Sequence, residues 1–276
     1  MSFSMKISII ISTKNEEKNI ENLLKSINSQ YCNELEIIIV DNNSKDKTCE
    51  IAKNYTSKIY SYGPERSAQR NFGVSKSIGK YLLILDADMI LEKGIIEELL
   101  KFAENNPDFK CLTLKEVPVG SSVWAKCKKL ELEFYTQPED FDLAPRWFEK
   151  KTFDQFNGFD ENQTGTEDWD LPDRIYKKYP QKYLTKLRVF HNEGDYGLLR
   201  ILKKKFYYAS KSHGFVEKTA GGVFNPRFIY FLRPQFYNHW KIWFKNPIIS
   251  ICLIDLLLLE TLVAGMGYLS KKLKYN

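Results

Sequence analysis

Short, continuously apolar runs in the first third of the chain constrain its fold more than any other feature. They occupy residues 7–11, where Ser8 is the one polar residue, 37–40 and 81–85. Segments with helical apolar spacing separate them, at residues 16–29, 47–55 and 68–77, and a further short strand is expected at residues 58–62. A run that is apolar at every position predicts a strand covered on both faces. The alternation predicts an α/β fold with a mostly parallel central sheet, flanked by helices and joined by right-handed crossovers.

Two carboxylates, Asp86 and Asp88, follow the third apolar run in the sequence LLILDADMIL. An unpaired buried carboxylate is costly, so this pair needs solvent, hydrogen-bond donors or a cation. In an extended segment the two side chains project to the same side, at the sheet edge where α/β proteins bind ligands. Carboxylates there suit Mg²⁺ or Mn²⁺, which complete their coordination with substrate phosphates. The alternative is that they close a turn or cap a helix at residues 94–103.

Polar residues also follow the first two strands, at residues 12–17 and 41–44. Because the ends of parallel strands meet at one edge of a sheet, these segments predict a binding edge. Exposed loops are polar in most proteins, and for these two ends alone that explanation is favoured.

A second acidic group lies in the segment TGTEDWDLPDR. Turn-forming residues over 154–168 predict a loop, which is followed by a helix with Asp170 as N-cap and Pro172 in its first turn. This placement explains Asp170 but leaves Glu167 and Asp168 on the loop without a structural role. Either carboxylate could remove a proton from an incoming hydroxyl. His191, after a strand-like segment, is either a packed histidine or a third metal ligand.

Four segments together resemble the inverting family 2 glycosyltransferases of the GT-A fold. They are ISIIISTKNEEKNIENLLKSI, LEIIIVDNNSKDKT, ERSAQRNFGVSKSIGKYLLILDADM and FDENQTGTEDWDLPDR, and the resemblance covers roughly residues 5–195. It implies a nucleotide-diphosphate sugar donor, a UDP- or GDP-sugar, together with a divalent cation. It departs from the family at Asp41-Asn42-Asn43-Ser44, where many members have VDDGS, so that a second carboxylate and a glycine are missing.

The resemblance also implies roles for individual residues. On the donor side, Thr13, Asn15 and Glu16 would line the nucleotide pocket and Asp41 would face the base. Arg70 would approach the diphosphate or the loop that holds it. Ribose or metal would be contacted by Asp86, the direct metal ligand would be Asp88, and His191 matches a metal-binding histidine of some GT-A enzymes. On the acceptor side, the general base would be Asp168, the acceptor site would be shaped by Glu167 and Trp169, and the loop would be oriented by Arg174.

The charge of the chain is unevenly distributed. From residue 200 onward there are 13 Lys and Arg against 3 Asp and Glu, whereas the preceding residues carry 28 against 32. The basic part interleaves aromatics with Lys and Arg at residues 225–247, and an apolar stretch follows at residues 248–269. This composition is typical of a segment at an anionic membrane surface. We therefore expect a catalytic domain over residues 1–220 and a membrane-associating helical tail over residues 221–276.

Asp255 and Glu260 bear on how the tail meets the membrane. An acidic side chain in the middle of a spanning helix costs about 2.5–3.5 kcal/mol. A helix that lies in the interface, or packs in a homodimer, is therefore favoured over a true span. The expected location is the cytoplasmic face of the cell membrane, and a lipid-linked or cell-surface glycan precursor is the expected acceptor.

Three other functions compete with the glycosyltransferase hypothesis. A sugar nucleotidyltransferase would need a glycine-rich loop after the first strand, which STKNEE does not provide. A catalytically silent nucleotide-sugar-binding or scaffold protein would not need both acidic groups. A nucleic-acid binder is disfavoured by the acidic first 199 residues. No Q-x-x-R-W segment, typical of processive family members, is present, which favours transfer of one sugar over polymerisation.

Overall fold

The computed structural model describes residues 7–30, 32, 34–192, 195 and 197–272, so the last four residues of the predicted tail lie outside it. The described chain divides into two compact units. The first comprises residues 1–117, 144–161 and 167–192, and the second comprises residues 118–143, 162–166 and 193–276. The expected boundary at residue 220 therefore differs from this division, since helices upstream of it belong to the second unit.

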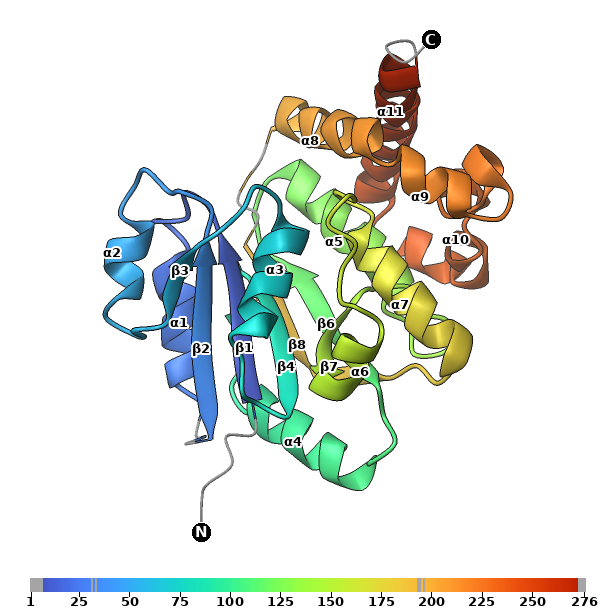
Figure 1. Cartoon of the computed structure of the whole chain (residues 1–276). Coiled ribbons are helices and arrows are strands. Elements are labelled where there is room, and N and C mark those ends of the chain that lie inside the picture. The colour runs from blue at the N-terminus through green and yellow to red at the C-terminus, as the bar shows by residue number, and fades with distance from the viewer. Residues whose placement is uncertain (1–6, 31, 33, 193–194, 196, 273–276) are drawn as a thin grey trace. The chain divides into compact units, whose positions relative to one another are not determined.

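An eight-stranded mixed sheet forms the first unit (Figure 1). Its strands are β1 (Ile7–Thr13), β2 (Leu35–Asp41), β3 (Ile59–Ser61), β4 (Tyr81–Asp86), β5 (Met89–Leu91), β6 (Cys111–Pro118), β7 (Pro145–Glu149) and β8 (Leu184–His191). They are ordered β3-β2-β1-β4-β7-β6-β8-β5. The half β3-β2-β1-β4 is parallel, as expected, but β7 pairs antiparallel with β4 and β6, and β8 pairs antiparallel with β5.

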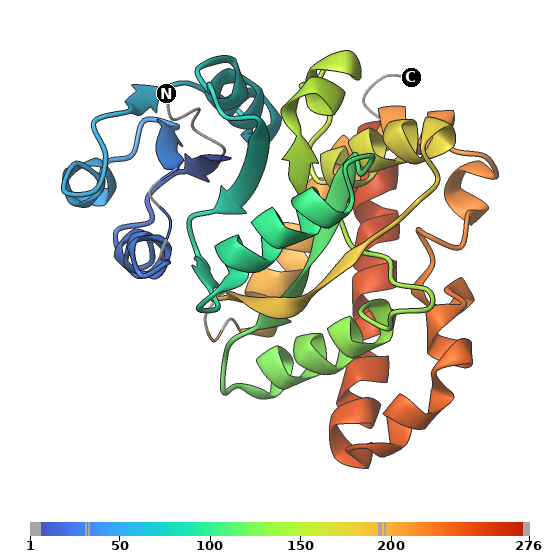
Figure 2. The same cartoon turned by 90° about the horizontal axis from the view of Figure 1, so that it is seen from below.

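The helices of the first unit cover both faces of the sheet. They are α1 (Ile20–Asn28), α2 (Thr48–Ala52), α3 (Arg66–Ser75), α4 (Ile95–Asn105), α6 (Lys150–Gln155) and α7 (Glu167–Lys178). Alternate residues of the central strands supply two separate cores, because successive side chains of a strand point to opposite faces. Ile9 and Ile11 pack with α1 and α4, whereas Ile10 packs with α3, α6 and α7. Figure 2 shows α1 and α3 on opposite sides of the parallel strands.

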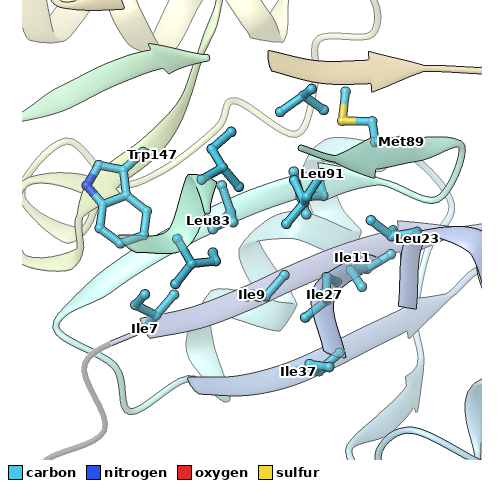
Figure 3. Packing of buried hydrophobic residues seen from close by; sticks show 14 of the residues in the cluster. Ile7, Ile9, Ile11, Leu23, Ile27, Ile37, Leu83, Met89, Leu91 and Trp147 are labelled. Atoms are coloured by element: carbon cyan, nitrogen blue, oxygen red, sulfur yellow. The ribbon is translucent and has the colours of Figure 1, made fainter. Parts of the chain in front are cut away.

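The core on the α1 face is close-packed and almost entirely aliphatic (Figure 3). Ile9, Leu23 and Leu83 each have no exposed area, and Trp147 closes the cluster beside Ile7. Complete burial of both strand faces explains why the three runs are apolar apart from Ser8, which is buried and hydrogen-bonded to Glu36 and to the backbone of Gly79. The core thus fixes the strand ends, which carry the polar residues considered below.

The second unit is helical. Its elements are α5 (Val123–Tyr135), α8 (Leu198–Lys211), α9 (His213–Lys218), η1 (Gly222–Phe224), η2 (Tyr230–Leu232), α10 (Gln235–Asn238), η3 (Trp240–Phe244) and α11 (Pro247–Lys272). The long helix α11 packs against α8 and α5. One side of α11 is buried in this unit, through Leu253, Leu256 and Leu257. In the described chain α11 is the one helix long and apolar enough to cross a membrane by length and composition.

Candidate active site

The ends of β1 and β2 form a tightly cross-linked pair of loops. The backbone N–H of Asn15 donates to Ser44 Oγ (2.7 Å), and that of Glu16 donates to Thr48 Oγ1 (2.7 Å). Asp41 is buried at the end of β2 and accepts from the backbone N–H of Ser44 (2.8 Å). Asn15 has a positive φ of 55°, a left-handed conformation that asparagine tolerates. The loops after β1 and β2 are thus held to each other by more hydrogen bonds than ordinary exposed loops need.

Two hydroxyl groups at the end of β1 are buried without a hydrogen bond among the described residues, Ser12 Oγ and Thr13 Oγ1. Buried polar atoms normally have partners, so such atoms at a strand end indicate a place where a ligand could bind. Gln69, on α3, holds the backbone here by donating from Nε2 to the carbonyl oxygens of Thr13 (3.0 Å) and Val40 (2.7 Å). The sequence analysis missed Gln69, although it is adjacent to Arg70 in a segment that carries the family resemblance.

The Asp86-Ala87-Asp88 segment is not extended, as the sequence analysis assumed. Asp86 ends β4, and Ala87 and Asp88 form a turn before β5. The two aspartates consequently have different partners. They do not cap α4 either, because its N-cap, Gly94, has no side-chain cap.

Asp86 faces three guanidinium groups. Its carboxylate lies 2.8 Å from Arg70 Nη2, 3.3 Å from Arg146 Nη2 and 4.0 Å from Arg66 Nη1. Burial by itself would raise the pKa of Asp86, but the three arginines hold it well below its ordinary value. Asp86 therefore acts, in this structure, as the anion around which the arginines assemble.

Arg70 links this cluster to the second acidic group. It has no exposed area, and its Nη1 donates to Asp168 Oδ1 at 2.8 Å while Nη2 donates to Asp86. Arg66 lies one helical turn earlier on α3 and donates from Nη2 to Glu167 Oε1 at 3.0 Å. Residues at i and i+4 share a helix face, so α3 presents both guanidinium groups to the same carboxylates.

Glu167 and Asp168 do not lie on a loop, contrary to the sequence expectation. They form the first turn of α7, which begins at Glu167 and not after Asp170, so Pro172 lies inside the helix. Carboxylates in a first turn interact favourably with the helix dipole. Asp170 instead accepts a hydrogen bond from Arg174 Nε (2.9 Å).

The two carboxylates differ in exposure and in protonation tendency. The Glu167 side chain is buried, and its Oε2 has no hydrogen-bond partner among the described residues. Burial, together with the neighbouring charge of Asp168, raises the pKa of Glu167. The Asp168 side chain is 28% exposed, and although burial opposes it, the charges of Arg70, Arg146 and Arg66 lower its pKa. Asp168 is therefore the carboxylate that is both ionised and accessible.

Asp88 pairs with His191 at the end of β8. Register pairing of Met89 with His191 brings the two together, and His191 Nε2 lies 3.1 Å from Asp88 Oδ1. Its Nδ1 lies 3.4 Å from Glu116 Oε2. Burial alone would lower the pKa of His191, but Asp88 and Glu116 raise it to about 10.

The Asp88 and His191 pair can be tested as a cation site. Two ligands on neighbouring corners of an octahedron with bonds of about 2.1 Å lie about 3.0 Å apart. The observed 3.1 Å permits this arrangement and is also the length of an ordinary N–H···O hydrogen bond. No group of three or more His, Cys, Asp or Glu able to hold a metal occurs in the described part of the chain. The residues thus fit a cation that takes two protein ligands and completes its shell from substrate and water, as Mg²⁺ commonly does.

The sequence analysis also missed Arg146 and Glu116. Arg146 Nε donates to Glu116 Oε1 at 2.9 Å, so this pair connects the arginine cluster with His191. Arg146 lies on β7 and Glu116 on β6. These antiparallel strands contain neither a continuous apolar run nor one of the four segments that resemble the family, so the sequence did not indicate how their residues would pair. Of the acceptor-side predictions, Arg174 donates to the carbonyl oxygens of Phe156 and Gly158 and so holds that turn, and Trp169 is half-buried on α7.

The arrangement combines three chemical elements at the ends of β1, β2 and β4. Polar loops with unsatisfied hydroxyls can bind a ligand, three arginines can stabilise negative charge, and the accessible Asp168 can accept a proton. These are requirements of a group transfer from a phosphorylated donor to a hydroxyl.

Comparison with known proteins gives the family. The model of glycosyl transferase family 2 matches residues 8–165. An uncharacterized glycosyltransferase of Methanocaldococcus jannaschii is 29% identical over 276 residues, covering 90% of this chain and 88% of that protein. A poly(ribitol-phosphate) beta-N-acetylglucosaminyltransferase of Staphylococcus aureus is 30% identical over 241 residues, covering 82% of this chain and 39% of that protein. A Campylobacter jejuni GalNAc(5)-diNAcBac-PP-undecaprenol beta-1,3-glucosyltransferase is 28% identical over 152 residues, or 50% and 48% of the two chains.

Solved structures show the same fold. The S. aureus enzyme TarS in complex with UDP has a TM-score of 0.59 at 16% identity, covering 98% of this chain and 91% of that chain. A mannosyltransferase from Pyrobaculum calidifontis, in complex with GDP-Man and Mn²⁺, has a TM-score of 0.59 at 15% identity, covering 98% and 81%. The match favours a transferase over a nucleotidyltransferase or a silent scaffold. The chain belongs to glycosyl transferase family 2 and is a glycosyltransferase with the GT-A fold.

Proposed function

We propose that the protein transfers one sugar from a nucleotide-diphosphate sugar to a hydroxyl acceptor, with inversion at the anomeric carbon. Solved neighbours bind UDP, UDP-GlcNAc or GDP-Man, which supports a UDP- or GDP-sugar as donor. The single observation that carries the proposal is the state of Asp168, which is ionised, partly exposed and fixed by one oxygen to the buried Arg70. Its other oxygen has no hydrogen-bond partner in the described chain and can face an acceptor.

The proposed mechanism begins with Asp168. As the acceptor hydroxyl attacks the anomeric carbon, Asp168 takes its proton, and the bond to the nucleotide diphosphate breaks on the opposite face. Glu167, whose pKa is raised by burial and by the charge of Asp168, shapes the acceptor side with Trp169. Arg70 holds Asp168 in one orientation, because its guanidinium is itself fixed between two carboxylates.

The nucleotide is proposed to bind at the ends of β1 and β2. The unsatisfied Thr13 hydroxyl and the loop at Asn15 and Glu16 line this region, and Asp41 lies at the end of β2 to face the base. Asn42 and Asn43 stand in the loop after Asp41 where many family members have the second carboxylate and the glycine of VDDGS. Arg66, the most exposed of the three arginines, is the one available to a diphosphate.

Asp88 and His191 are the residues proposed to hold Mg²⁺ or Mn²⁺. When bound, the cation supplies positive charge against the departing diphosphate. His191 must lose its proton to become a ligand, and Glu116 at its Nδ1 can keep the ring oriented. The three arginines around Asp86 make a metal role for that residue less suitable than one in fixing the guanidinium groups.

The acceptor is proposed to be membrane-linked, because the outer side of α11 is apolar and exposed. Its exposed residues include Ile251, Ile254, Leu258, Leu262, Met266 and Leu269, which recur at helical spacing. The same unit also exposes aromatic side chains, among them Phe224, Tyr237, Trp240 and Phe244. Of the two acidic residues predicted to disfavour insertion, Glu260 is buried and paired with Lys128, whereas Asp255 is exposed.

An interfacial position fits this helix better than a span. The inner side of α11 packs on α5 and α8, and both helices carry exposed lysines such as Lys126, Lys129 and Lys203. A spanning α11 would bring these charges into the hydrocarbon. The relative from C. jejuni, whose name specifies an undecaprenol-linked substrate, supports a lipid-linked acceptor. The cytoplasmic face and a homodimer remain predictions.

Donor use tests the proposal. Full-length protein is incubated in detergent with UDP- and GDP-sugars, with Mn²⁺ or EDTA, and donor binding and nucleotide release are measured. We expect one donor to bind and release its nucleotide slowly, Asp88→Ala to lose metal-dependent binding, and Asp168→Asn to bind normally but release nucleotide at least 100-fold more slowly. Asp108→Asn, an exposed aspartate outside the cluster, is the matched control.

Two results would contradict the proposal. One is the absence of binding to any nucleotide sugar by the wild-type protein. The other is equal nucleotide release by Asp168→Asn and Asp108→Asn, since Asp168 would then have no part in the reaction.

A further inference from the structure

A pocket of about 280 Å³ lies wholly within the second unit, apart from the residues assigned to sugar transfer. Its wall includes Trp124 and Lys128 of α5, and Ile201, Lys204 and Lys205 of α8. Three lysines therefore line a pocket whose remaining wall is largely apolar and aromatic. Glu260 of α11 is the one carboxylate among the residues that line it.

The charge of Glu260 is already compensated. Lys128 Nζ lies 2.6 Å from Glu260 Oε1 and 2.8 Å from Glu131 Oε2. The Tyr230 hydroxyl donates to Glu260 Oε2 at 2.6 Å. Both oxygens of Glu260 are thus engaged by groups other than the lysines of α8.

Lys205 is less fully compensated, because the charge of Glu260 favours its protonated form only partly and burial outweighs it. Its ammonium donates to the Tyr230 hydroxyl at 2.7 Å, and no carboxylate of the described residues forms an ion pair with it. Burial lowers the pKa of Lys205 to about 8, so the pocket holds a cation that is costly to keep charged. An anion placed against it would remove that cost, and Lys204, the next residue, lies at the same wall.

The apolar walls of the pocket indicate that a suitable ligand also has an apolar part. Trp124 and Ile201 line the pocket together with Pro118, Val119 and the rings of Tyr208 and Tyr230. A small hydrated anion alone would make no contact with these apolar side chains, whereas the chain of a phosphate ester would pack against them. Phosphate also suits two adjacent lysines better than a carboxylate does, because a monoester offers three oxygens and up to two charges, and a diphosphate link between glycan and lipid keeps one charge on each phosphate.

We propose that this pocket binds a phosphate ester carried by an apolar chain, with the phosphate at Lys205 and Lys204 and the chain along Trp124 and Ile201. The inference rests on the proposed function in one respect: it identifies the phosphate ester with the group that joins glycan and lipid in the acceptor. The same chemistry is present in free phosphate and in soluble phosphate esters, so the experiment separates these sources.

The experiment measures binding to the full-length protein in detergent by isothermal titration. The probes are a ten-carbon prenyl phosphate, the corresponding prenyl alcohol and inorganic phosphate. We expect the prenyl phosphate to bind at least ten times more tightly than either of the others. Lys205→Met should weaken this binding about 10- to 100-fold, the range expected for one charge-assisted hydrogen bond. Lys203→Met, an exposed lysine of α8 that does not line the pocket, should change it less than twofold.

Lys204→Met keeps the test decisive if Lys205→Met does not fold, because Lys204 is exposed and its replacement leaves the buried residues in place. Weaker binding in Lys204→Met than in Lys203→Met supports the pocket. Equal weakening in both variants overturns it, because the attraction would then be a general effect of positive charge. Failure of the prenyl phosphate to bind also overturns it, as does equally tight binding of the alcohol or of inorganic phosphate.

Donor binding is measured in the same preparation. Binding of a nucleotide sugar without binding of the prenyl phosphate overturns only the pocket. Binding of the prenyl phosphate without any nucleotide sugar overturns only the donor assignment.

Discussion

Replacement of Arg70 by methionine tests the arginine cluster most directly. Met retains much of the apolar volume of the side chain but removes both hydrogen bonds, each 2.8 Å long, to Asp168 and Asp86. Arg70 has no exposed area, and loss of one partner of a buried ion pair costs about 3–5 kcal/mol. Asp86 keeps Arg146 at 3.3 Å, and Asp168 is partly exposed to water. We therefore expect a loss near the lower limit, about 3 kcal/mol of unfolding free energy.

A double-mutant cycle separates this interaction from general damage. Urea unfolding is followed by the fluorescence of tryptophan in wild type, Arg70→Met, Asp168→Asn and the double variant. Because the two side chains are in direct contact, Asp168→Asn should cost about 1–3 kcal/mol less in the Arg70→Met background than in the wild type. Lys101→Met is the control: its ion pair with Glu97 is fully exposed, and its loss should leave the unfolding free energy unchanged within error.

The reasoning would be refuted by either of two results. If Arg70→Met costs less than about 1 kcal/mol, the cluster does not depend on its buried guanidinium. If Asp168→Asn costs the same in both backgrounds, Arg70 does not act on Asp168, and the proposed orientation of the general base fails.

Three further predictions concern the stability of the first unit. Burial opposes ionisation of Glu36, but hydrogen bonds from the Ile78 backbone, a lysine and a serine lower its pKa. The contribution of ionised Glu36 to the free energy of unfolding is therefore present above pH 4.5 and is lost as the pH falls. Glu36→Gln should lower the unfolding free energy by about 1–3 kcal/mol at pH 7, with a smaller difference from wild type at pH 3; an equal difference would contradict this. Gly79→Ala places Cβ 2.5 Å from Ser8 Oγ and should cost about 1–3 kcal/mol in thermal unfolding, whereas Gly214→Ala, with open space, should not; equal effects would refute the contact. Leu24→Ala in the core should cost about 2–5 kcal/mol by urea unfolding, and a cost under about 1 kcal/mol would show that this position is not tightly packed.

The parallel half of the sheet could be predicted from the sequence because burial on both faces imposes the simplest pattern. Ile9 and Ile10 point into different cores, so neither position can be polar, and a short run apolar at every position results. The antiparallel half lacks this pattern. In β6, Lys115 to Pro118 is only half-buried, and in β7 Arg146 is a buried polar residue. Neither strand therefore forms a continuous apolar run, and neither could be predicted from the sequence.

The candidate site was predictable in its carboxylates but not in their partners. Asp86, Asp88 and Asp168 lie in segments that can be recognised locally. Arg146 and Glu116 join them only through pairing of strands distant in sequence, and no local pattern specifies that contact. The start of α7 was misplaced because Asp170 is an equally good N-cap by residue type, although in the structure its carboxylate is bound to Arg174.

The two sides of α11 determine how a soluble form of this protein could be made. Cutting the chain before Pro247 would remove Leu253, Leu256 and Leu257 from the core of the second unit and leave Lys128 without its Glu260 partner. A truncated protein would therefore expose the sides of α5 and α8 that pack on α11, and we expect it to aggregate. Serine in place of the exposed residues Ile251, Leu258 and Leu262 would keep the buried side intact. For expression and crystallisation, α11 should therefore be kept, because its buried side belongs to the core, and only its exposed side should be made more polar.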